Sequence, residues 1–194
     1  MIKDITIAFR ILVVLTIITG LMYPIFITAS AKALFGEKAA GSLIFSNDKQ
    51  VCGSELIGQK FVSERYFRSR PSASDYNLPS SGSNLGPTSA LLVKTFNQRK
   101  ADILKAHGYE AYETSIEVPQ ELLFASASGV DPHISPNGVK FQFERVANAR
   151  KFDLLKKKRL LEIIENLTQY PQFGFLGEAS VNVLKLNMAL DEIK

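Results

Sequence analysis

A long uncharged stretch near the N-terminus places the strongest constraint on how this chain can fold. Residues 11–31 contain no charged side chain and lie between Arg10 and Lys32. At about 1.5 Å per residue, a helix over this stretch is roughly 31 Å long, close to the ~30 Å hydrocarbon core of a bilayer. A lone segment in that environment satisfies its backbone polar groups only as a helix. The stretch therefore predicts a membrane-spanning helix.

Two interpretations fit this stretch, a retained anchor and a cleaved signal peptide. Residues 29–31 (ASA) supply a small-x-small cleavage site, but the apolar core of a signal peptide spans only about 7–15 residues. The greater length favours an anchor. Because the tail before the span is very short, we expect a single-pass protein of the cell (inner or plasma) membrane. Its N-terminus would be cytoplasmic and the bulk of the chain extracytoplasmic.

Small or polar residues recur every four positions within the span. They are Thr16, Gly20, Pro24 and Thr28, and small residues at such spacing let two helices approach closely in lipid. Pro24 also removes the hydrogen bond to the carbonyl of Gly20, which predicts a kink. Two interpretations remain open: chance composition, or a face that docks on partner helices.

Composition limits what the rest of the chain can be. The net charge of +4 is small and dispersed, which argues against nucleic acid as a partner. Cys52 is the only cysteine, so no internal disulfide can form, and two distant histidines offer no metal-ligand cluster. We expect an α+β chain, with a single N-terminal transmembrane helix followed by one compact mixed α/β extracytoplasmic domain. The expected parts are a tail, the span, a connector and the domain, over residues 1–10, 11–31, 32–41 and 42–194.

Apolar periodicity and capping residues predict the elements of this domain. Helices are expected over residues 88–106, 148–167 and 186–193, with a helical turn at 121–123. Short strands are expected over residues 42–45, 116–118 and 181–183, and a turn at 47–48. Two segments are ambiguous: residues 56–62 form a strand or irregular structure, and residues 141–143 a strand or a helix start. Loops or connectors are expected over residues 66–87, 125–136 and 170–177.

No motif in the chain predicts catalysis. The chain has no Gly-x-x-x-x-Gly-Lys-Ser/Thr loop for phosphates. Ser126, Asp131 and His133 lie close together in sequence, whereas the members of a catalytic triad are usually distant and meet only through the fold. We therefore assign no catalytic residue and no metal ligand.

Eight ordered segments give the chain a resemblance to a known family. They are residues 19–24, 41–44, 53–61, 66–72, 81–86, 126–136, 145–150 and 181–191. In these segments the chain resembles the C subunit of the Kdp-type potassium-transporting P-type ATPase, the KdpC family. One departure is Lys151, where the family often has a glycine, and it affects only a helix boundary.

The resemblance implies a non-catalytic membrane subunit of a high-affinity, ATP-driven potassium uptake pump. The implied partners are a channel-like potassium-translocating subunit, an ATP-hydrolysing P-type subunit and a small membrane subunit. No intrinsic cofactor is implied: K+ is the ion that the complex transports, and ATP acts through the complex. The family is described as a catalytic chaperone that raises the ATP affinity of the hydrolysing subunit. Its suggested nucleotide contacts fall here on Ser126, Ser128, Gly129 and Gln142.

The long loop suggests further contacts with partners. We expect the loop over residues 66–87 to lie over the potassium entrance, with contacts from Tyr66, Arg68, Arg70 and Asn84. Arginine suits such contacts because its guanidinium is a rigid multidentate donor; the alternative is that Arg68 and Arg70 are ordinary surface arginines. The alternative function is a membrane-tethered extracytoplasmic enzyme that acts alone.

Overall fold

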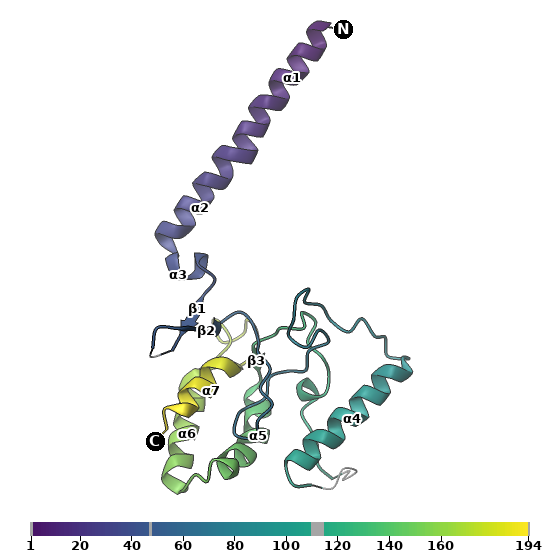
Figure 1. Ribbon diagram of the computed structural model, residues 1–194, viewed down its shortest axis with the longest axis vertical. Helices are drawn as coiled ribbons and strands as arrows, with labels where there is room; N and C mark the ends of the chain where they lie inside the picture. Colours follow the sequence, from purple (N-terminus) through teal and green to yellow (C-terminus); the bar gives the residue numbers. More distant parts are fainter. Residues whose placement is uncertain (1, 47, 110–114, 194) are drawn as a thin grey trace. The chain divides into compact units, whose positions relative to one another are not determined.

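The structure is a computed structural model that describes residues 2–46, 48–109 and 115–193 (Figure 1). The chain divides into two compact units, Met1–Ser54 and Glu55–Lys194. The predicted mixture of helices and strands after a long apolar helix is confirmed. Residues 42–54, which we expected to belong to the large domain, form part of the first unit.

The first unit begins with a helix that is long and apolar enough to cross a membrane, Ile2–Leu34. It consists of α1 (Ile2–Thr16), a π-helical segment η1 (Ile17–Met22) and α2 (Tyr23–Leu34). The N–H of Tyr23 donates to the carbonyl of Ile18, one residue further back than in an α-helix. This wider turn directly precedes Pro24, which has no N–H to donate. The kink at Pro24 stays a prediction.

The remainder of the first unit is a short helix and a hairpin. Helix α3 (Gly36–Ala39) lies within the predicted connector. Strand β1 (Leu43–Phe45) pairs antiparallel with β2 (Val51–Ser54), which confirms the strand expected over residues 42–45. The predicted turn at 47–48 includes Asn47, which lies outside the described residues.

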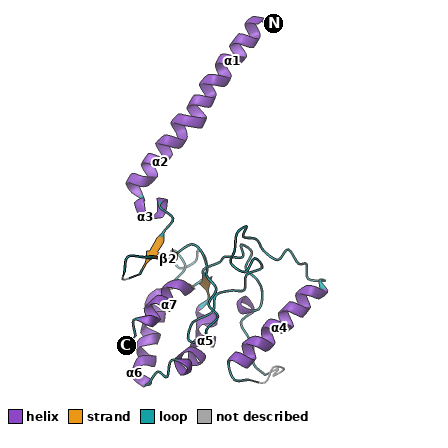
Figure 2. Cartoon of the chain, in the orientation of Figure 1, coloured by secondary structure: helices purple, strands orange, loops and turns teal. Residues whose placement is uncertain are grey.

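The second unit combines helices with a small sheet and long irregular connections (Figure 2). Its helices are α4 (Ala90–Ala106), the 3₁₀ turn η2 (Gln120–Leu122), α5 (Pro136–Ala149), α6 (Leu154–Leu167) and α7 (Val183–Asp191). Its strands are β3 (His133–Ile134), β4 (Thr168–Gln169) and β5 (Ser180–Asn182). The sheet order is β3-β5-β4, antiparallel throughout. Residues 55–89 form neither helix nor strand, as predicted for the loop at 66–87, and residues 56–62 take the irregular alternative.

Side-chain caps explain where four of these helices begin. A side-chain oxygen at each N-cap accepts a hydrogen bond from the backbone N–H three residues later, which satisfies one orphan donor. The caps are Ser89 for α4, Ser135 for α5, Asp153 for α6 and Asn182 for α7. The core is formed by α4, α5, α6, α7, the sheet and the segment around Phe67. Its fully buried apolar side chains are Phe67, Leu104, Val139, Val146, Leu160, Val181, Val183, Leu186 and Leu190.

Several sequence predictions are wrong. The loop expected over 125–136 contains strand β3, and Val183, expected at the end of a strand, begins α7. Residues 116–118 are not a strand; they run irregularly into the 3₁₀ turn, with Val118 buried in the core. The helix expected over 148–167 is two helices, because α5 ends at Ala149 and α6 begins at Leu154. The apolar pattern continues through this junction, and a local backbone signal overrides it. Residues 141–143 belong to α5, which settles their ambiguity in favour of helix.

A Schellman motif ends α5. The N–H of Lys151 donates to the carbonyl of Asn148 (3.0 Å), and the N–H of Phe152 donates to that of Ala147 (2.9 Å). Lys151 has a φ of 57°, in the left-handed region. Glycine is the residue that adopts this conformation without a steric penalty. The departure from the family pattern thus carries a conformational cost at this boundary.

We expect Lys151→Gly to stabilise the second unit. Relief of the left-handed strain gains ~1–2 kcal/mol, and the greater backbone entropy of glycine in the unfolded chain removes ~0.5–1 kcal/mol. The net gain in the free energy of unfolding should be about 0.5–1 kcal/mol. Urea unfolding of the full chain in mild detergent, followed by circular dichroism, measures it. The matched control is Lys158→Gly, exposed inside α6, which should lose ~1 kcal/mol. A loss of stability in Lys151→Gly would contradict the assignment.

Candidate functional site

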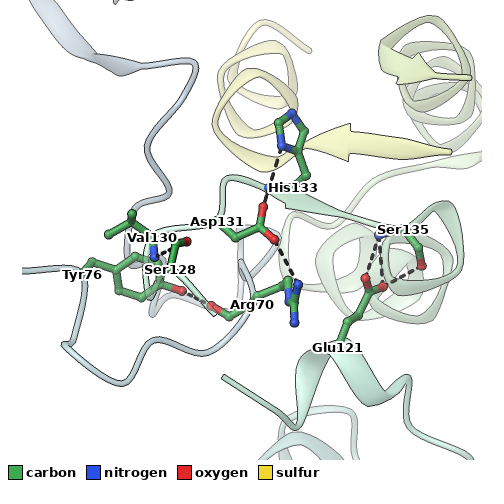
Figure 3. Close-up of polar contacts among 8 residues, drawn as sticks. All are labelled: Arg70, Tyr76, Glu121, Ser128, Val130, Asp131, His133 and Ser135. Atoms are coloured by element: carbon green, nitrogen blue, oxygen red, sulfur yellow. Dashed lines mark hydrogen bonds and ion pairs between the residues drawn. The ribbon is translucent and has the colours of Figure 1, made fainter. Parts of the chain in front are cut away.

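The candidate site combines the extended residues 66–71 with the loop 126–135, and both lie in the second unit. Figure 3 shows Arg70 of the first segment beside Ser128, Asp131 and His133 of the second. Two side-chain amides bind the extended segment. Asn187, from α7, accepts from the N–H of Phe67 (2.9 Å) and donates to its carbonyl (2.9 Å). Gln142, from α5, accepts from the N–H of Arg68 (2.8 Å) and donates to its carbonyl (3.2 Å). We call this pair of contacts the amide clamp.

Arg145 extends the amide clamp by one turn of α5. Its guanidinium donates to the carbonyls of Glu64 (2.6 Å) and Tyr66 (3.0 Å), and to Oε1 of Gln142 (2.8 Å). Burial, together with the nearby charge of Arg68, lowers the pKa of Arg145 to about 10. It therefore remains charged at neutral pH and anchors the segment to the helix.

Gln142 is one of the predicted nucleotide contacts, and its amide already has several partners. The side chain is only 1% exposed. Its oxygen accepts two hydrogen bonds, and its nitrogen donates to the carbonyls of Arg68 and Gly138 (3.3 Å). This gives Gln142 a structural role in the clamp. A contact with nucleotide would require these bonds to be exchanged.

The other predicted nucleotide contacts lie in a tightly bonded turn. The N–H of Ser126 donates to the carbonyl of Pro71 (2.9 Å), and that of Gly129 donates to the carbonyl of Ser126 (3.2 Å). The hydroxyl of Ser128 accepts from the N–H of Val130 (3.2 Å). Gly129 has a φ of 74°, and a Cβ there would lie 2.5 Å from the carbonyl oxygen of Ser81. The loop therefore needs glycine at this position and packs closely against its neighbour.

Asp131 fixes the next part of the loop. Its carboxylate accepts from Arg70 (3.0 Å) and from the N–H of His133 (2.9 Å), and Nδ1 of His133 lies 3.8 Å away. Figure 3 shows Asp131 between these two side chains. Burial alone would raise the pKa of Asp131, but the hydrogen bonds from His133 and Arg70 outweigh it and hold the pKa below its ordinary value. The carboxylate of Asp131 therefore stays charged and holds the loop in place through these contacts. Its lowered pKa makes it a poor proton acceptor and does not suit a general base.

The backbone of Arg70 is held as well. The hydroxyl of Tyr76 donates to the carbonyl of Arg70. Burial raises the pKa of Tyr76 to about 12, so this hydroxyl keeps its proton and remains a donor. Both ends of Arg70, backbone and side chain, therefore have partners within the chain.

A carboxylate occupies the N-terminus of α5. Both oxygens of Glu121 accept from the N–H of Ser135 (3.1 and 2.9 Å), and the Ser135 hydroxyl donates to Oε1 (2.6 Å) (Figure 3). Negative charge is favourable there because of the helix dipole. A Cβ at Gly138 would lie 2.2 Å from Oε1 of Glu121, so glycine admits the carboxylate. The position where this helix would receive a phosphate is thus filled by the chain itself.

The four predicted outer-loop contacts have different environments. Tyr66 donates to Asp191 (3.0 Å), and the guanidinium of Arg150 lies 4.9 Å from the centre of its ring. Arg70 pairs with Asp131, Arg68 lines a cavity, and Asn84 is exposed with a φ of 53°. Their contact with a partner stays a prediction.

Sequence reasoning missed two features of this unit. Neither Arg145 nor Asn187 was predicted as a site residue, and only the fold brings them to the extended segment. Residues 170–176, expected to be a connector, present their large apolar side chains to solvent around a Gln172–Leu176 bridge. Tyr170, Phe173 and Phe175 are 68%, 86% and 75% exposed. The sequence signal that could have revealed this surface is the presence of three aromatic residues within a short connector. Within the described residues, no group of three or more metal-ligating side chains comes together.

Comparison with known proteins assigns the chain to a family. The profile of the family described as "K+-transporting ATPase, c chain" matches residues 5–192. The chain is similar to the potassium-transporting ATPase KdpC subunits of three bacteria. With that of Polynucleobacter asymbioticus it is 45% identical over 92% of this chain and 93% of the relative. With that of Paraburkholderia xenovorans it is 47% identical over 94% and 93%, and with that of Methylococcus capsulatus 44% over 96% of each.

The match runs from the apolar helix, through the amide clamp and the loop at 126–135, to α7. The chain therefore belongs to the family of K+-transporting ATPase c chains.

Proposed function

We propose that this chain is a non-catalytic accessory subunit of an ATP-driven potassium uptake pump, which it joins and stabilises through its membrane helix. Family membership over residues 5–192 is the observation that carries this proposal. The helix stays in the membrane as an anchor, with the N-terminus in the cytoplasm and the second unit outside. Its partners are the channel-like subunit, the ATP-hydrolysing subunit and the small membrane subunit.

The π-helical segment supports the docking face Thr16–Gly20–Pro24–Thr28. Four residues of α-helix advance the side-chain direction by about 40°, so three such steps add roughly 120° between Thr16 and Thr28. A π-helical turn takes up about one extra residue, which reverses roughly 100° of that advance. Thr16 and Thr28 then point in directions only ~20° apart. The small residues then form a nearly straight stripe along the helix, along which a partner helix can pack.

The surroundings of Gly20 also support the docking face. A Cβ at Gly20 would meet only the methyl of Thr16, at an ordinary 3.8 Å, so nothing in the described part of this chain requires glycine there. Further along, a hollow of about 400 Å³ is lined by Pro24, Ile25, Thr28, Ala29 and Lys32. A small residue and a hollow on one face are what a partner helix needs for close approach.

The second unit contributes a surface of its own. Large apolar patches on soluble domains commonly mark interaction sites. The exposed aromatic residues of segment 170–176 form such a surface, and a partner subunit of the pump would cover it. Contacts from Tyr66, Arg68, Arg70 and Asn84 remain part of the proposal, with Asn84 the one most open to solvent.

The effect on ATP affinity is proposed to be indirect. With the second unit outside the membrane, Ser126, Ser128, Gly129 and Gln142 are across the bilayer from cytosolic ATP. An effect on nucleotide affinity then has to be a coupling free energy, carried by two pump states that differ in their contacts with this subunit. Gln142 and the turn at residues 126–129 already make hydrogen bonds within this chain. These bonds favour an indirect coupling to nucleotide affinity over a direct contact with ATP.

We expect Gly20→Leu to weaken assembly. The leucine side chain would hold the partner helix away from the stripe, and the yield of co-purified pump subunits should fall about tenfold, equivalent to ~1.4 kcal/mol. Quantitative pull-down in mild detergent measures it. The control is Val14→Phe, which enlarges a residue roughly 160° away from Thr16 around an α-helix and should leave the yield unchanged. Equal yields for Gly20→Leu and wild type would refute the docking face.

Cys52 tests the orientation of the chain. It is the only cysteine and its side chain is exposed in β2, soon after the membrane helix. We expect a membrane-impermeant maleimide to label it in intact cells. Cys52→Ser is the control for background labelling. Labelling that appears only after lysis would place the second unit in the cytoplasm and reverse the proposed topology.

A further inference from the structure

A small cavity lies between α4 and the clamped segment. Its volume is about 230 Å³, and its lining includes Arg68, Arg99, Asp102, His107, Leu122 and Gln142. One wall comes from α4 and its C-cap, the other from the extended segment, η2 and α5. Figure 1 shows α4 at one side of the unit, separated from α5 by irregular chain. The cavity is thus at the junction between α4 and the rest of its unit.

Arg68 brings a buried donor without a partner to the lining of this cavity. Its Nε is buried and makes no hydrogen bond within the part of the chain that the structure describes. Nε of Arg70 and Nε of Arg145 are also buried without a partner among the described residues. These two arginines differ from Arg68 in their terminal N–H groups, because Arg70 pairs with Asp131 and Arg145 donates to three oxygens. A buried donor without a partner costs free energy, and a charged donor costs more. Arg68 is therefore a binding group that the fold leaves unused.

His107 presents a second unused polar atom. Its Nδ1 lies 2.7 Å from the carbonyl of Ile103, to which it donates, and its ring packs on Phe141 with 4.5 Å between centroids. Its Nε2 is buried and has no hydrogen-bond partner among the described residues. The packing holds the ring in place, so Nε2 has a fixed direction.

The charges around His107 are mostly positive. Arg68 comes from the extended segment and Arg145 from α5, while Arg99 and Asp102 come from its own helix. Burial lowers the pKa of His107, and the charges of Arg145 and Arg68 lower it further. Arg99 donates to the carbonyl of Leu123 (2.9 Å), and Asp102 accepts from Gln98 (3.0 Å). Among the described residues, the lining therefore carries two arginines against the single carboxylate of Asp102 and has a net positive charge.

We propose that this cavity binds a small oxyanion, a phosphate or a carboxylate, between the guanidinium of Arg68 and Nε2 of His107. A guanidinium binds both groups through paired N–H donors. The volume lies below the ~300–1,000 Å³ of most small-molecule sites, which fits a single phosphate or carboxylate. Because the amide of Gln142 is bonded in the clamp, the site differs from the nucleotide contact predicted for that residue.

Binding is expected to be linked to protonation. With Nδ1–H donating to Ile103, neutral His107 has a lone pair at Nε2, which repels an oxyanion. Binding therefore draws one proton from the solvent onto Nε2, and the resulting N–H donates to the anion. An opposite charge within ~4–6 Å raises a histidine pKa by about one unit or more. By reciprocity, the anion binds about tenfold more tightly below the free-state pKa, and this advantage is lost as the pH rises through the bound-state pKa.

The two histidines of the chain allow a direct test. His107 and His133 are the only two, so ¹⁵N-histidine NMR of the full chain in detergent gives two ring signals, assigned with His133→Gln. We expect sodium phosphate to raise the pKa of His107 by roughly one unit, relative to sodium chloride at equal ionic strength. The ring signals of His133, which is outside the cavity, should not respond to phosphate. Sodium acetate distinguishes the source, because a response to phosphate alone indicates phosphate and a response to acetate indicates a carboxylate.

Matched variants complete the test. Arg68→Gln should abolish the phosphate-induced shift of His107, whereas Arg65→Gln, an exposed arginine outside the cavity, should retain it. An unchanged His133 signal shows that each variant is folded. The proposal is overturned if neither anion shifts His107 in the wild type, or if Arg68→Gln responds as the wild type does. It is also overturned if Glu110→Gln with Glu113→Gln lowers the His107 pKa in chloride, since the counter-charge would then come from this chain.

Discussion

The amide clamp is the interaction on which the packing of the second unit depends. Residues 66–70 cross the core without a strand partner, and each buried backbone group left without a hydrogen bond would cost ~1–3 kcal/mol. Asn187 and Gln142 together satisfy both backbone groups of two consecutive residues. Phe67 can therefore be completely buried between helices. The same contacts tie α5 to α7 through the segment, so a long irregular stretch behaves as part of the core.

The helices of this unit could be predicted because their signals are local. The helix predicted over residues 88–106 matches α4 within two residues, and Gly108 after it is a visible stop signal. The start of α6 was missed, because its N-cap Asp153 lies inside the helix predicted over residues 148–167. The junction at Lys151 could not be predicted, because lysine is not a residue that indicates a left-handed conformation. The apolar pattern also continues across this position. Strands β3 and β4 have two residues each and are too short for periodicity to register. Their pairing depends on the sheet, whose strands lie far apart in the chain.

The candidate site was less predictable than the fold. Gln142 entered through the family resemblance alone, and its role as a clamp follows from a contact over 74 positions in sequence. The clamp at Asn187 spans 120 positions. Nothing local separates these residues from polar side chains on a solvated helix face. Ser126, Asp131 and His133 show the opposite case, because their nearness in sequence suggested chemistry while their hydrogen bonds brace a turn.

The clamp and the cavity are consequences of the same backbone geometry. Successive side chains of an extended segment point to opposite sides, so burying Phe67 against the core turns Arg68 the other way, into the cavity beside α4. Gln142 makes hydrogen bonds to both the N–H and the carbonyl of Arg68. These bonds keep the backbone from rotating, so the guanidinium stays on the side of the cavity. The position of that charge is thus set by the packing of its neighbour. A cation placed in this way is preorganised, so the binding of a ligand costs little conformational entropy to order this side chain.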